Sequence, residues 1–166
     1  MGMLLVLLRG AGGFAVPLTR IWYDSIELES GRWQYTYEVV NISLTDPIEE
    51  FTIWFDFGLY ENLAIETLHP PAGDWDEIVW QPEPVIEDDG AYDAKAEAWN
   101  PGISIGESVS GFSISFDWLG EGVPGPQFYE IIDPATFETI DSGYTVPEPV
   151  TLILLGLGGL FLKRLV

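Results

Sequence analysis

The sequence predicts an all-β protein, an antiparallel sandwich of two β-sheets followed by a C-terminal hydrophobic helix. Three observations lead to this prediction. Apolar and polar residues alternate with a period of two between residues 20 and 142, which is typical of strands with one buried face. Turn-forming residues separate these runs, and no segment between them has the apolar stripe of an amphipathic helix. The last apolar run, residues 150–162, is instead apolar on every side.

The alternation is clearest in three runs, residues 33–39, 51–57 and 112–118. The apolar residues that share a face in each run are Trp33, Tyr35, Tyr37 and Val39, then Phe51, Ile53, Phe55 and Phe57, then Phe112, Ile114, Phe116 and Trp118. Turns are expected at residues 30–31, 46–47, 70–73, 88–90, 100–102 and 120–126. About seven to nine short strands at this spacing predict two packed sheets, in either an immunoglobulin-like or a jelly-roll arrangement.

Composition indicates one folded, acidic domain in a chain of 166 residues. Hydrophobic residues make up 47% of the chain, enough to form a core despite a net charge of −21. Only Arg20, Arg32 and Lys95 are basic between residues 16 and 144, where all but one of the acidic residues lie. Such a surface repels phosphate backbones, which argues against nucleic-acid binding. The sequence has no cysteine, which excludes disulfides, a thiol nucleophile and thiolate metal sites.

Residues 1–15 are expected to be a signal peptide. An apolar run is followed by small and apolar residues, and Gly13, Phe14 and Ala15 form a small-x-small cleavage pattern. Arg9 interrupts the apolar run, so a truncated signal or a buried first strand is the alternative. The predicted organisation is therefore a signal peptide over residues 1–15, an acidic sandwich over residues 16–144 and a tail over residues 145–166.

The tail combines a proline-rich segment, an apolar run and two cations. Residues 150–162 carry no charge, and Lys163 and Arg164 follow at once, as expected for the cytoplasmic flank of a membrane segment. At about 1.5 Å per residue the run covers roughly 20 Å of a hydrocarbon layer about 30 Å thick, so it spans only with local thinning or borrowed flanking residues. A buried core helix is the alternative, and the glycines of the run disfavour it.

Directly before this run stand Val146, Pro147, Glu148 and Pro149. In composition, spacing and terminal position, the tail resembles the PEP-CTERM sorting signal of bacterial exported proteins. The resemblance implies that a membrane-embedded exosortase, acting through its own cysteine nucleophile, recognises the motif and removes the anchor. It further implies an exported, non-enzymatic protein of a Gram-negative bacterium. Such a protein passes through an inner-membrane-anchored intermediate to the cell surface or the extracellular matrix, in association with exopolysaccharide or biofilm.

Proline gives the motif an extended backbone, because it fixes φ and disfavours helix in the residue before it. Val146 and Glu148 are therefore expected outside any helix, accessible to an enzyme at the membrane face. The same triplet occurs at Pro82, Glu83 and Pro84 with no apolar run or basic pair after it. That internal copy is expected to be a loop.

Few residues suggest catalysis by this chain. His69 is the single histidine, and it stands beside Pro70 and Pro71 with no serine or cysteine nucleophile pattern in the sequence. We therefore expect an exposed loop histidine rather than a general base. The carboxylates could supply a pair for glycoside hydrolysis, but with so many of them a suitable pair is expected by chance. A secreted glycan-active enzyme is the weakest hypothesis.

A carbohydrate- or calcium-binding adhesion module is the stronger alternative to a plain surface or matrix protein. Calcium prefers oxygen ligands on a loop. Two acidic clusters offer such ligands, and they are Glu87, Asp88 and Asp89, and Asp74, Asp76 and Glu77. Neither cluster has the spacing of an EF-hand loop, so ordinary solvated turns are the other interpretation.

Exposed tryptophans would bind sugars by stacking against their rings. Trp54 is expected on the polar face of its strand, together with Thr52 and Asp56, and Trp75 is expected in an acidic loop. These two are the predicted stacking residues, whereas core packing is the simpler role for most tryptophans. Polysaccharide is thus the expected partner of the domain, and exosortase and the membrane are those of the tail.

Overall fold

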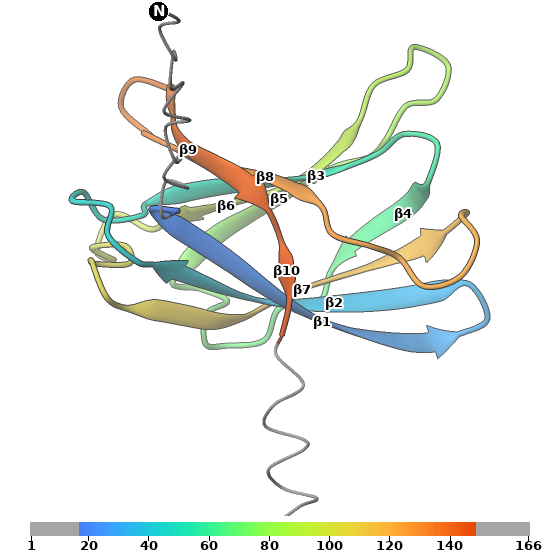
Figure 1. The fold of residues 1–166 in the computed structure, drawn as a ribbon, viewed down its shortest axis with the longest axis horizontal. Helices are drawn as coiled ribbons and strands as arrows, with labels where there is room; N and C mark the ends of the chain where they lie inside the picture. The colour runs from blue at the N-terminus through green and yellow to red at the C-terminus, as the bar shows by residue number, and fades with distance from the viewer. Residues whose placement is uncertain (1–16, 149–166) are drawn as a thin grey trace, which may run out of the picture.

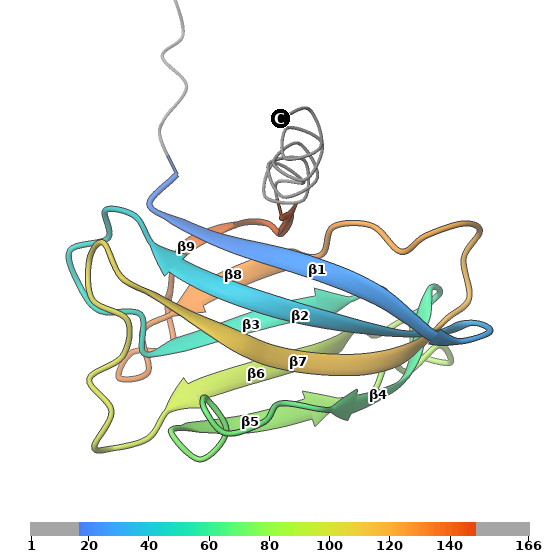
Figure 2. The ribbon, with the colours of Figure 1, turned by 90° about the horizontal axis from the view of Figure 1, so that it is seen from below.

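The computed structural model describes residues 17–148, which form two five-stranded β-sheets packed face to face (Figure 1 and Figure 2). The strands are β1 (Thr19–Glu29), β2 (Arg32–Asn41), β3 (Glu50–Phe55), β4 (Tyr60–Ile65), β5 (Trp75–Trp80), β6 (Gly90–Ala96), β7 (Ser108–Trp118), β8 (Phe128–Ile132), β9 (Thr139–Tyr144) and β10 (Val146–Pro147). Sheet I has the strand order β10-β1-β2-β7-β4, and sheet II has the order β5-β6-β3-β8-β9.

The predicted two-sheet sandwich is confirmed, with one departure from the antiparallel pattern. β10 runs parallel to β1, with Trp22 opposite Val146 and Tyr23 opposite Pro147. No helix occurs among residues 17–148, and the helix predicted for residues 150–162 lies outside the described residues. Within the described range, no helix is long and apolar enough to cross a membrane. The predicted signal peptide over residues 1–15 also lies outside the described range.

The alternation in the sequence correctly identifies the faces that pack between the sheets. Of the residues expected to share the inner face, the fully buried ones are Tyr35, Tyr37, Val39, Phe51, Ile53, Phe55, Phe112, Ile114 and Phe116. Trp33 and Trp118 lie at the margin of this core and are half-buried. Phe57 departs from the prediction, because β3 ends at Phe55 and the backbone turns where Leu59 N–H donates to the Asp56 carbonyl at 3.0 Å.

The core is mainly aromatic, and its tyrosine hydroxyls find partners inside the sandwich. The Tyr35 and Phe116 rings meet edge to face with centroids 5.0 Å apart, a favourable arrangement for two π-systems. Buried Gln127, at the end of the β7–β8 connection, donates from Nε2 to the Tyr60 hydroxyl at 3.0 Å and accepts from the Tyr37 hydroxyl at 3.3 Å. Burial raises the pKa of Tyr37 well above its ordinary value, so this hydroxyl stays a neutral donor.

The segment after β9 belongs to the sandwich up to the end of the described residues. Thr145 is buried, and its N–H donates to the Gln127 carbonyl at 2.8 Å. Glu148 N–H donates to the Tyr23 carbonyl at 2.9 Å, which extends the pairing of β10 with β1. The sequence places the start of the tail at residue 145, whereas the structure bonds Thr145 to Gln127 and residues 146–148 to β1 of sheet I.

Candidate functional site

The outer face of sheet II carries a line of side chains that crosses all five strands and is aromatic on four of them. Trp80 on β5 is paired with Ala91 on β6, and Ala91 is paired with Trp54 on β3. On the other side of β3, Phe128 on β8 is paired with Tyr144 on β9. The β3–β8 register ends at Ile53 opposite Tyr129, so Trp54 stands next to Phe128. We call Trp80, Trp54, Phe128 and Tyr144 the aromatic row.

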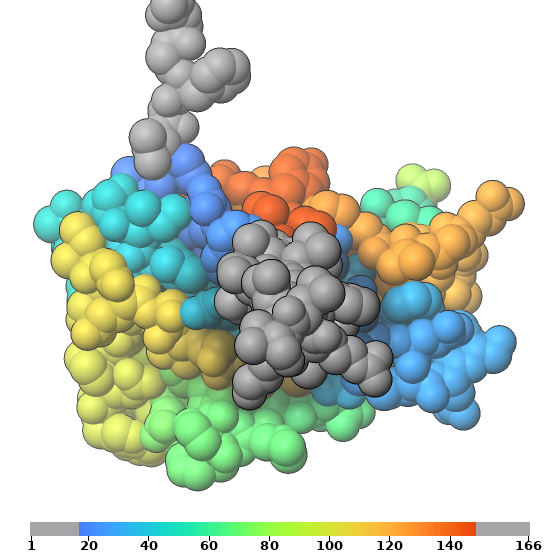
Figure 3. Space-filling model, turned by 60° about the horizontal axis from the view of Figure 1, so that its bottom comes forward, coloured from blue at the N-terminus to red at the C-terminus, as the bar shows by residue number. Residues whose placement is uncertain are grey.

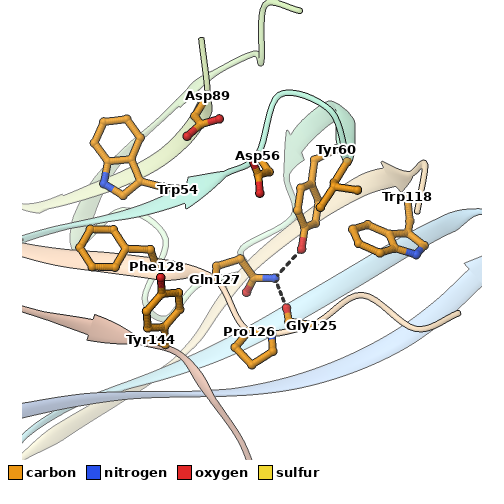
Figure 4. Close-up of a pocket in the computed structure, with 11 residues that line it drawn as sticks. Trp54, Asp56, Tyr60, Asp89, Trp118, Gly125, Pro126, Gln127, Phe128 and Tyr144 are labelled. Carbon is orange, nitrogen blue, oxygen red and sulfur yellow. Dashed lines mark hydrogen bonds between the residues drawn. The ribbon is translucent and has the colours of Figure 1, made fainter. Parts of the chain in front are cut away.

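The rings of the aromatic row are open to solvent at both ends and half-buried in the middle. Trp80 is 52% exposed and Tyr144 is 67% exposed, whereas Trp54 and Phe128 are half-buried. The Phe128 and Tyr144 ring centroids lie 5.5 Å apart. Trp54 Nε1 donates to Glu130 Oε2 at 3.0 Å, which fixes the orientation of the indole. Figure 4 shows Trp54, Phe128 and Tyr144 lying close together.

A cleft of about 470 Å³ opens beside the middle of the aromatic row (Figure 4). It extends from Trp54 past Phe128 to Trp118, at the end of the sandwich where the β7–β8 connection passes between the sheets. Its lining residues are Trp54, Asp56, Leu59, Tyr60, Asp89, Trp118, Gly125, Pro126, Gln127, Phe128 and Tyr144. Aromatic walls with a few polar groups are typical of a small-molecule site.

Carboxylates border the aromatic row on one side. Asp56 and Asp89 are exposed and line the cleft at the end of β3 and the start of β6. Asp89 Oδ1 accepts from Phe57 N–H at 3.0 Å, so the turn after β3 holds this carboxylate in place. Both groups are hydrogen-bond acceptors beside an aromatic surface.

A second line of side chains follows on the other side, one pleat along the strands. Its members pair in the order Ile78, Asp93, Thr52, Glu130 and Ser142. Asp93 is 8% exposed, and Thr52 Oγ1 donates to its Oδ2 at 2.7 Å. Burial, with the nearby Glu50 carboxylate, raises the pKa of Asp93 to about 6 despite this hydrogen bond and despite Lys95. We call this line the polar row.

The one basic residue on the strands of sheet II, within residues 17–148, pairs with a carboxylate. Lys95 Nζ lies 3.4 Å from Glu50 Oε2, an oxygen that is buried and accepts no hydrogen bond from any described residue. The face therefore combines ring surfaces for apolar contact with oxygen acceptors on both sides. Such an arrangement can bind a molecule that is apolar on its flat sides and rich in hydroxyl groups at its edges.

The predicted exposure of Trp54 is confirmed in part, and the predicted exposure of Trp75 is wrong. Trp54 is on the outer face as the alternation requires, although it is half-buried. Trp75 is only 4% exposed, because it begins β5 on the inner face and packs against Phe51 and Phe112 with ring centroids 5.9 Å and 5.2 Å away. A ring enclosed in the core cannot stack on a ligand.

The structure does not support either predicted calcium cluster. Residues 17–148 contain no group of three or more acidic or histidine side chains arranged to hold a metal ion. Among Glu87, Asp88 and Asp89, Asp88 pairs through its backbone with Glu83, and Asp89 holds the turn after β3.

The second acidic cluster divides because neighbouring residues of a strand point to opposite faces. Asp74 precedes β5, and Asp76 is on the outer face of the strand. Glu77 instead faces inward, where it accepts hydrogen bonds from the Tyr92 hydroxyl and, at 2.6 Å, from Thr67 Oγ1. The three carboxylates of this cluster therefore do not converge on one position.

Two loop predictions are confirmed. His69 is exposed in the loop before β5, and its Nδ1 lies 2.5 Å from the Ala72 carbonyl oxygen. The internal triplet of Pro82, Glu83 and Pro84 lies in the β5–β6 connection.

Most of the aromatic row, namely Trp80, Phe128 and Tyr144, is not among the stacking residues that the sequence predicts. Alternation within β5 could have placed Trp80 opposite to Val79, and the same signal in residues 128–132 could have placed Phe128 opposite to Tyr129. The register between strands is what brings the rings together, and alternation within one strand does not contain it.

Part of the predicted sorting motif lies at the edge of sheet I. Val146 and Pro147 are extended and exposed, as expected, but their backbone is paired with β1 rather than free. Pro149, Lys163 and Arg164 lie outside the described residues.

No protein-family model matches the chain, and no curated protein matches it. Among solved structures, the chain is similar to an uncharacterised Nocardia farcinica protein with an immunoglobulin-like fold, at 15% identity, 76% coverage of this chain, 98% of that chain and a TM-score of 0.49. It is similar to the chitin-binding domain of Chi18aC from Streptomyces coelicolor, at 20% identity, 67% and 89% coverage and a TM-score of 0.40. It is also similar to the second type II cohesin module of the ScaA scaffoldin of Acetivibrio cellulolyticus, at 15% identity, 80% and 95% coverage and a TM-score of 0.40.

Proposed function

We propose that the chain is an exported, non-enzymatic bacterial surface module whose folded domain binds carbohydrate through the aromatic row. The observation that carries this proposal is the row itself, four aromatic side chains in register across the outer face of one sheet. An isolated exposed ring needs no functional explanation, but several rings aligned on one face of a domain mark a binding surface.

The chemistry of the surface fits a sugar better than an apolar ligand. The flat side of a pyranose ring presents C–H groups that stack on Trp80 or Tyr144. Its hydroxyl groups point outward, where the exposed carboxylates of Asp56 and Asp89 can accept hydrogen bonds. Glu130, on the other side of the row, already accepts from Trp54 and Thr139. Because the rings stand on paired strands rather than on a flexible loop, the surface is formed before the ligand arrives.

The sorting role rests on the C-terminal motif. Val146 and Pro147 are extended and exposed at the edge of sheet I, a suitable position for recognition by a processing enzyme. In this proposal exosortase cleaves near the motif, and residues 150–162 with Lys163 and Arg164 hold the intermediate in the inner membrane. The acidic domain is delivered to the cell surface or the matrix, where exopolysaccharide is its ligand.

Affinity electrophoresis through gels containing neutral β-linked polysaccharides, hydroxyethyl cellulose and xylan, tests the binding proposal. The double variant Trp54→Ala, Trp80→Ala should lose at least tenfold in affinity for each polysaccharide that retards the wild type, equivalent to about 1.4 kcal/mol, because stacking contacts are lost. The matched control is Trp22→Ala on sheet I, which should be retarded as strongly as the wild type. Equal retardation of the double variant and the wild type would remove the aromatic row from the mechanism, and turnover of the polysaccharide would contradict a non-enzymatic role.

Mass spectrometry of the mature protein from its native host tests the sorting proposal. The wild type should end near the motif and lack residues 150–166. The variant Glu148→Ala, Pro149→Ala should keep those residues and accumulate in the membrane fraction. A mature wild-type protein with an intact C-terminus would contradict processing.

A further inference from the structure

We infer that the aromatic row binds a single extended chain of β-linked, uncharged or positively charged sugars, lying across the strands of sheet II. This inference rests on the proposed carbohydrate-binding function and specifies its ligand class. Three features of the surface lead to it: the direction of the row, the spacing of its rings, and the sign of the charges beside it.

The row follows one line of the strand register, because Trp80 and Trp54 are both paired with Ala91, Trp54 stands next to Phe128, and Phe128 is paired with Tyr144. A bound chain that contacts all the rings must therefore run perpendicular to the strands. A helically coiled α-linked chain curves away from a straight line of contacts, whereas an extended β-linked chain follows it. The geometry thus selects the linkage of the polysaccharide.

The spacing of three of the rings, Trp80, Trp54 and Tyr144, fits two sugars for each step, and Phe128 lies between the last two with its centroid 5.5 Å from that of Tyr144. Neighbouring strands lie about 4.8 Å apart, so Trp80 and Trp54, which are two strands apart, are separated by about 10 Å along the row. Tyr144 lies two strands beyond Trp54, which gives a second step of about 10 Å. This step is comparable to the length of a disaccharide unit in an extended β-linked chain, so successive stacking positions meet equivalent faces of every second sugar.

The twist of the sheet favours a single chain over a flat crystalline surface. Adjacent strands are rotated by roughly 20° in such sheets, so rings spread over five strands do not share one plane. A separate chain can follow this rotation about its glycosidic bonds. The aromatic row is therefore suited to soluble or amorphous polysaccharide.

The charge beside the row excludes anionic polysaccharides. Asp56, Asp89 and Glu130 border the rings, and Lys95 is the only basic residue that sheet II contributes within the described chain. Lys95 Nζ already lies 3.4 Å from Glu50 Oε2, so the Glu50 carboxylate largely neutralises its charge. A chain of uronate or sulfated sugars would meet repulsion along its whole length, whereas hydroxyl and amino groups are hydrogen-bond donors to these carboxylates.

Isothermal titration calorimetry on the purified full chain tests the inference with sugars of matched length. We expect cellohexaose and chitohexaose to bind at least tenfold more tightly than cellobiose, because only the longer chains reach from Trp80 to Tyr144. Maltohexaose, which has the same sugar as cellohexaose in α linkage, should bind at least tenfold more weakly than cellohexaose. Alginate should show no heat of binding at low salt.

End-of-row variants sharpen the same experiment. Trp80→Ala and Tyr144→Ala should each weaken cellohexaose binding about fivefold to tenfold and change cellobiose binding less than twofold. Trp22→Ala should change neither. Equal affinity for cellobiose and cellohexaose, equal affinity for maltohexaose, or tight binding of alginate would overturn the inference while leaving carbohydrate binding in place. An absence of binding to every carbohydrate, gel-phase polysaccharides included, would overturn the proposed function itself.

Discussion

The two outer faces of the sandwich have the same number of strands and opposite surface chemistry. The outer face of sheet I, toward which Figure 2 and Figure 3 look, is formed largely by β1, β2 and β7. Its central strands β2 and β7 carry mainly hydroxyl, amide and charged side chains, with Trp22 and Ile26 beside them on β1, whereas the outer face of sheet II carries the aromatic row. One sheet is therefore suited to face water and the other to bind a ligand, although both obey the same inward alternation.

The polar groups of sheet I bind one another. Arg32 donates to Asp117 Oδ1 at 2.9 Å and to Ser115 Oγ at 2.7 Å, and Gln34 Nε2 donates to Ser113 Oγ at 2.6 Å. The comparison teaches that polarity alone does not identify a binding surface. Donors and acceptors that are already paired with each other form few hydrogen bonds to a ligand. Exposed rings with unpaired acceptors beside them can form both stacking contacts and hydrogen bonds.

The largest loss of stability should come from replacing Trp75, which lies in the core and on neither outer face. Trp75→Ala should lower the free energy of unfolding by about 3–5 kcal/mol, because it leaves a cavity beside Phe51 and Phe112. Trp54→Ala, the matched change on the outer face, should cost about 1 kcal/mol because solvent replaces part of the lost contact. Urea unfolding measures both. Equal losses would show that Trp54 is a structural residue and would break the contrast between core and outer face.

The next largest loss of stability should come from breaking the hydrogen bonds of Arg32 on sheet I. Arg32→Ala removes the partner of Asp117 and should cost about 1–2 kcal/mol at low salt, less in high salt because the pair is partly exposed. Polysaccharide affinity should not change. A loss of binding without unfolding would contradict the assignment of the ligand to sheet II.

Asp93 should make the free energy of unfolding depend on pH, because burial raises the pKa of its carboxyl group. The pKa of Asp93 is about 6 in the folded protein and about 3.9 in an unfolded chain, so its ionisation above pH 6 costs stability. As pH falls from 6 to 4, the folded protein takes up a proton that the unfolded chain does not bind, and this cost disappears. Asp93→Asn should therefore stabilise the protein by on the order of 1 kcal/mol at pH 7.5 and by nothing at pH 4.

Thermal unfolding at the two pH values measures this difference. Asp24→Asn on the exposed part of β1 removes the same formal charge and is the control for the overall negative charge of the chain. If both variants stabilise equally at pH 7.5, the effect belongs to net charge and not to the buried position of Asp93.

The smallest effect on stability should come from the most exposed ring of the aromatic row after Tyr144. Trp80→Ala should change the free energy of unfolding by less than about 0.5 kcal/mol, because more than half of the side chain already faces solvent. A cost above about 2 kcal/mol would mean that Trp80 covers Ala91 as part of the fold rather than standing ready for a ligand.

The sequence was sufficient to predict the strands, because a period of two in residues such as Phe112, Ile114 and Phe116 results directly from burial of one face. It also placed Trp54 on the outer face for the same reason. The acidic residues around Trp75 predict a loop, yet Trp75 begins a strand and faces inward. The alternation that starts at Trp75 therefore predicts its strand and its burial better than the neighbouring charges do.

The aromatic row itself could not be predicted from local pattern. Its rings come from strands that are distant in sequence, and the pairing of Trp80 with Ala91 and of Phe128 with Tyr144 depends on the strand order of sheet II. The pairing of Val146 with Trp22 is likewise a long-range contact. Proline predicted the extended backbone there, but nothing near it in the sequence specified the partner strand.

The indole N–H signals of the seven tryptophans, followed by two-dimensional NMR during titration with cellohexaose, test the central claim most directly. The outer face of sheet II is the ligand surface if the Trp54 and Trp80 signals shift in a saturable way while those of Trp22 and Trp75 stay in place. A shift of Trp22 with no change at Trp54 and Trp80 would contradict it, because the ligand would then lie on sheet I.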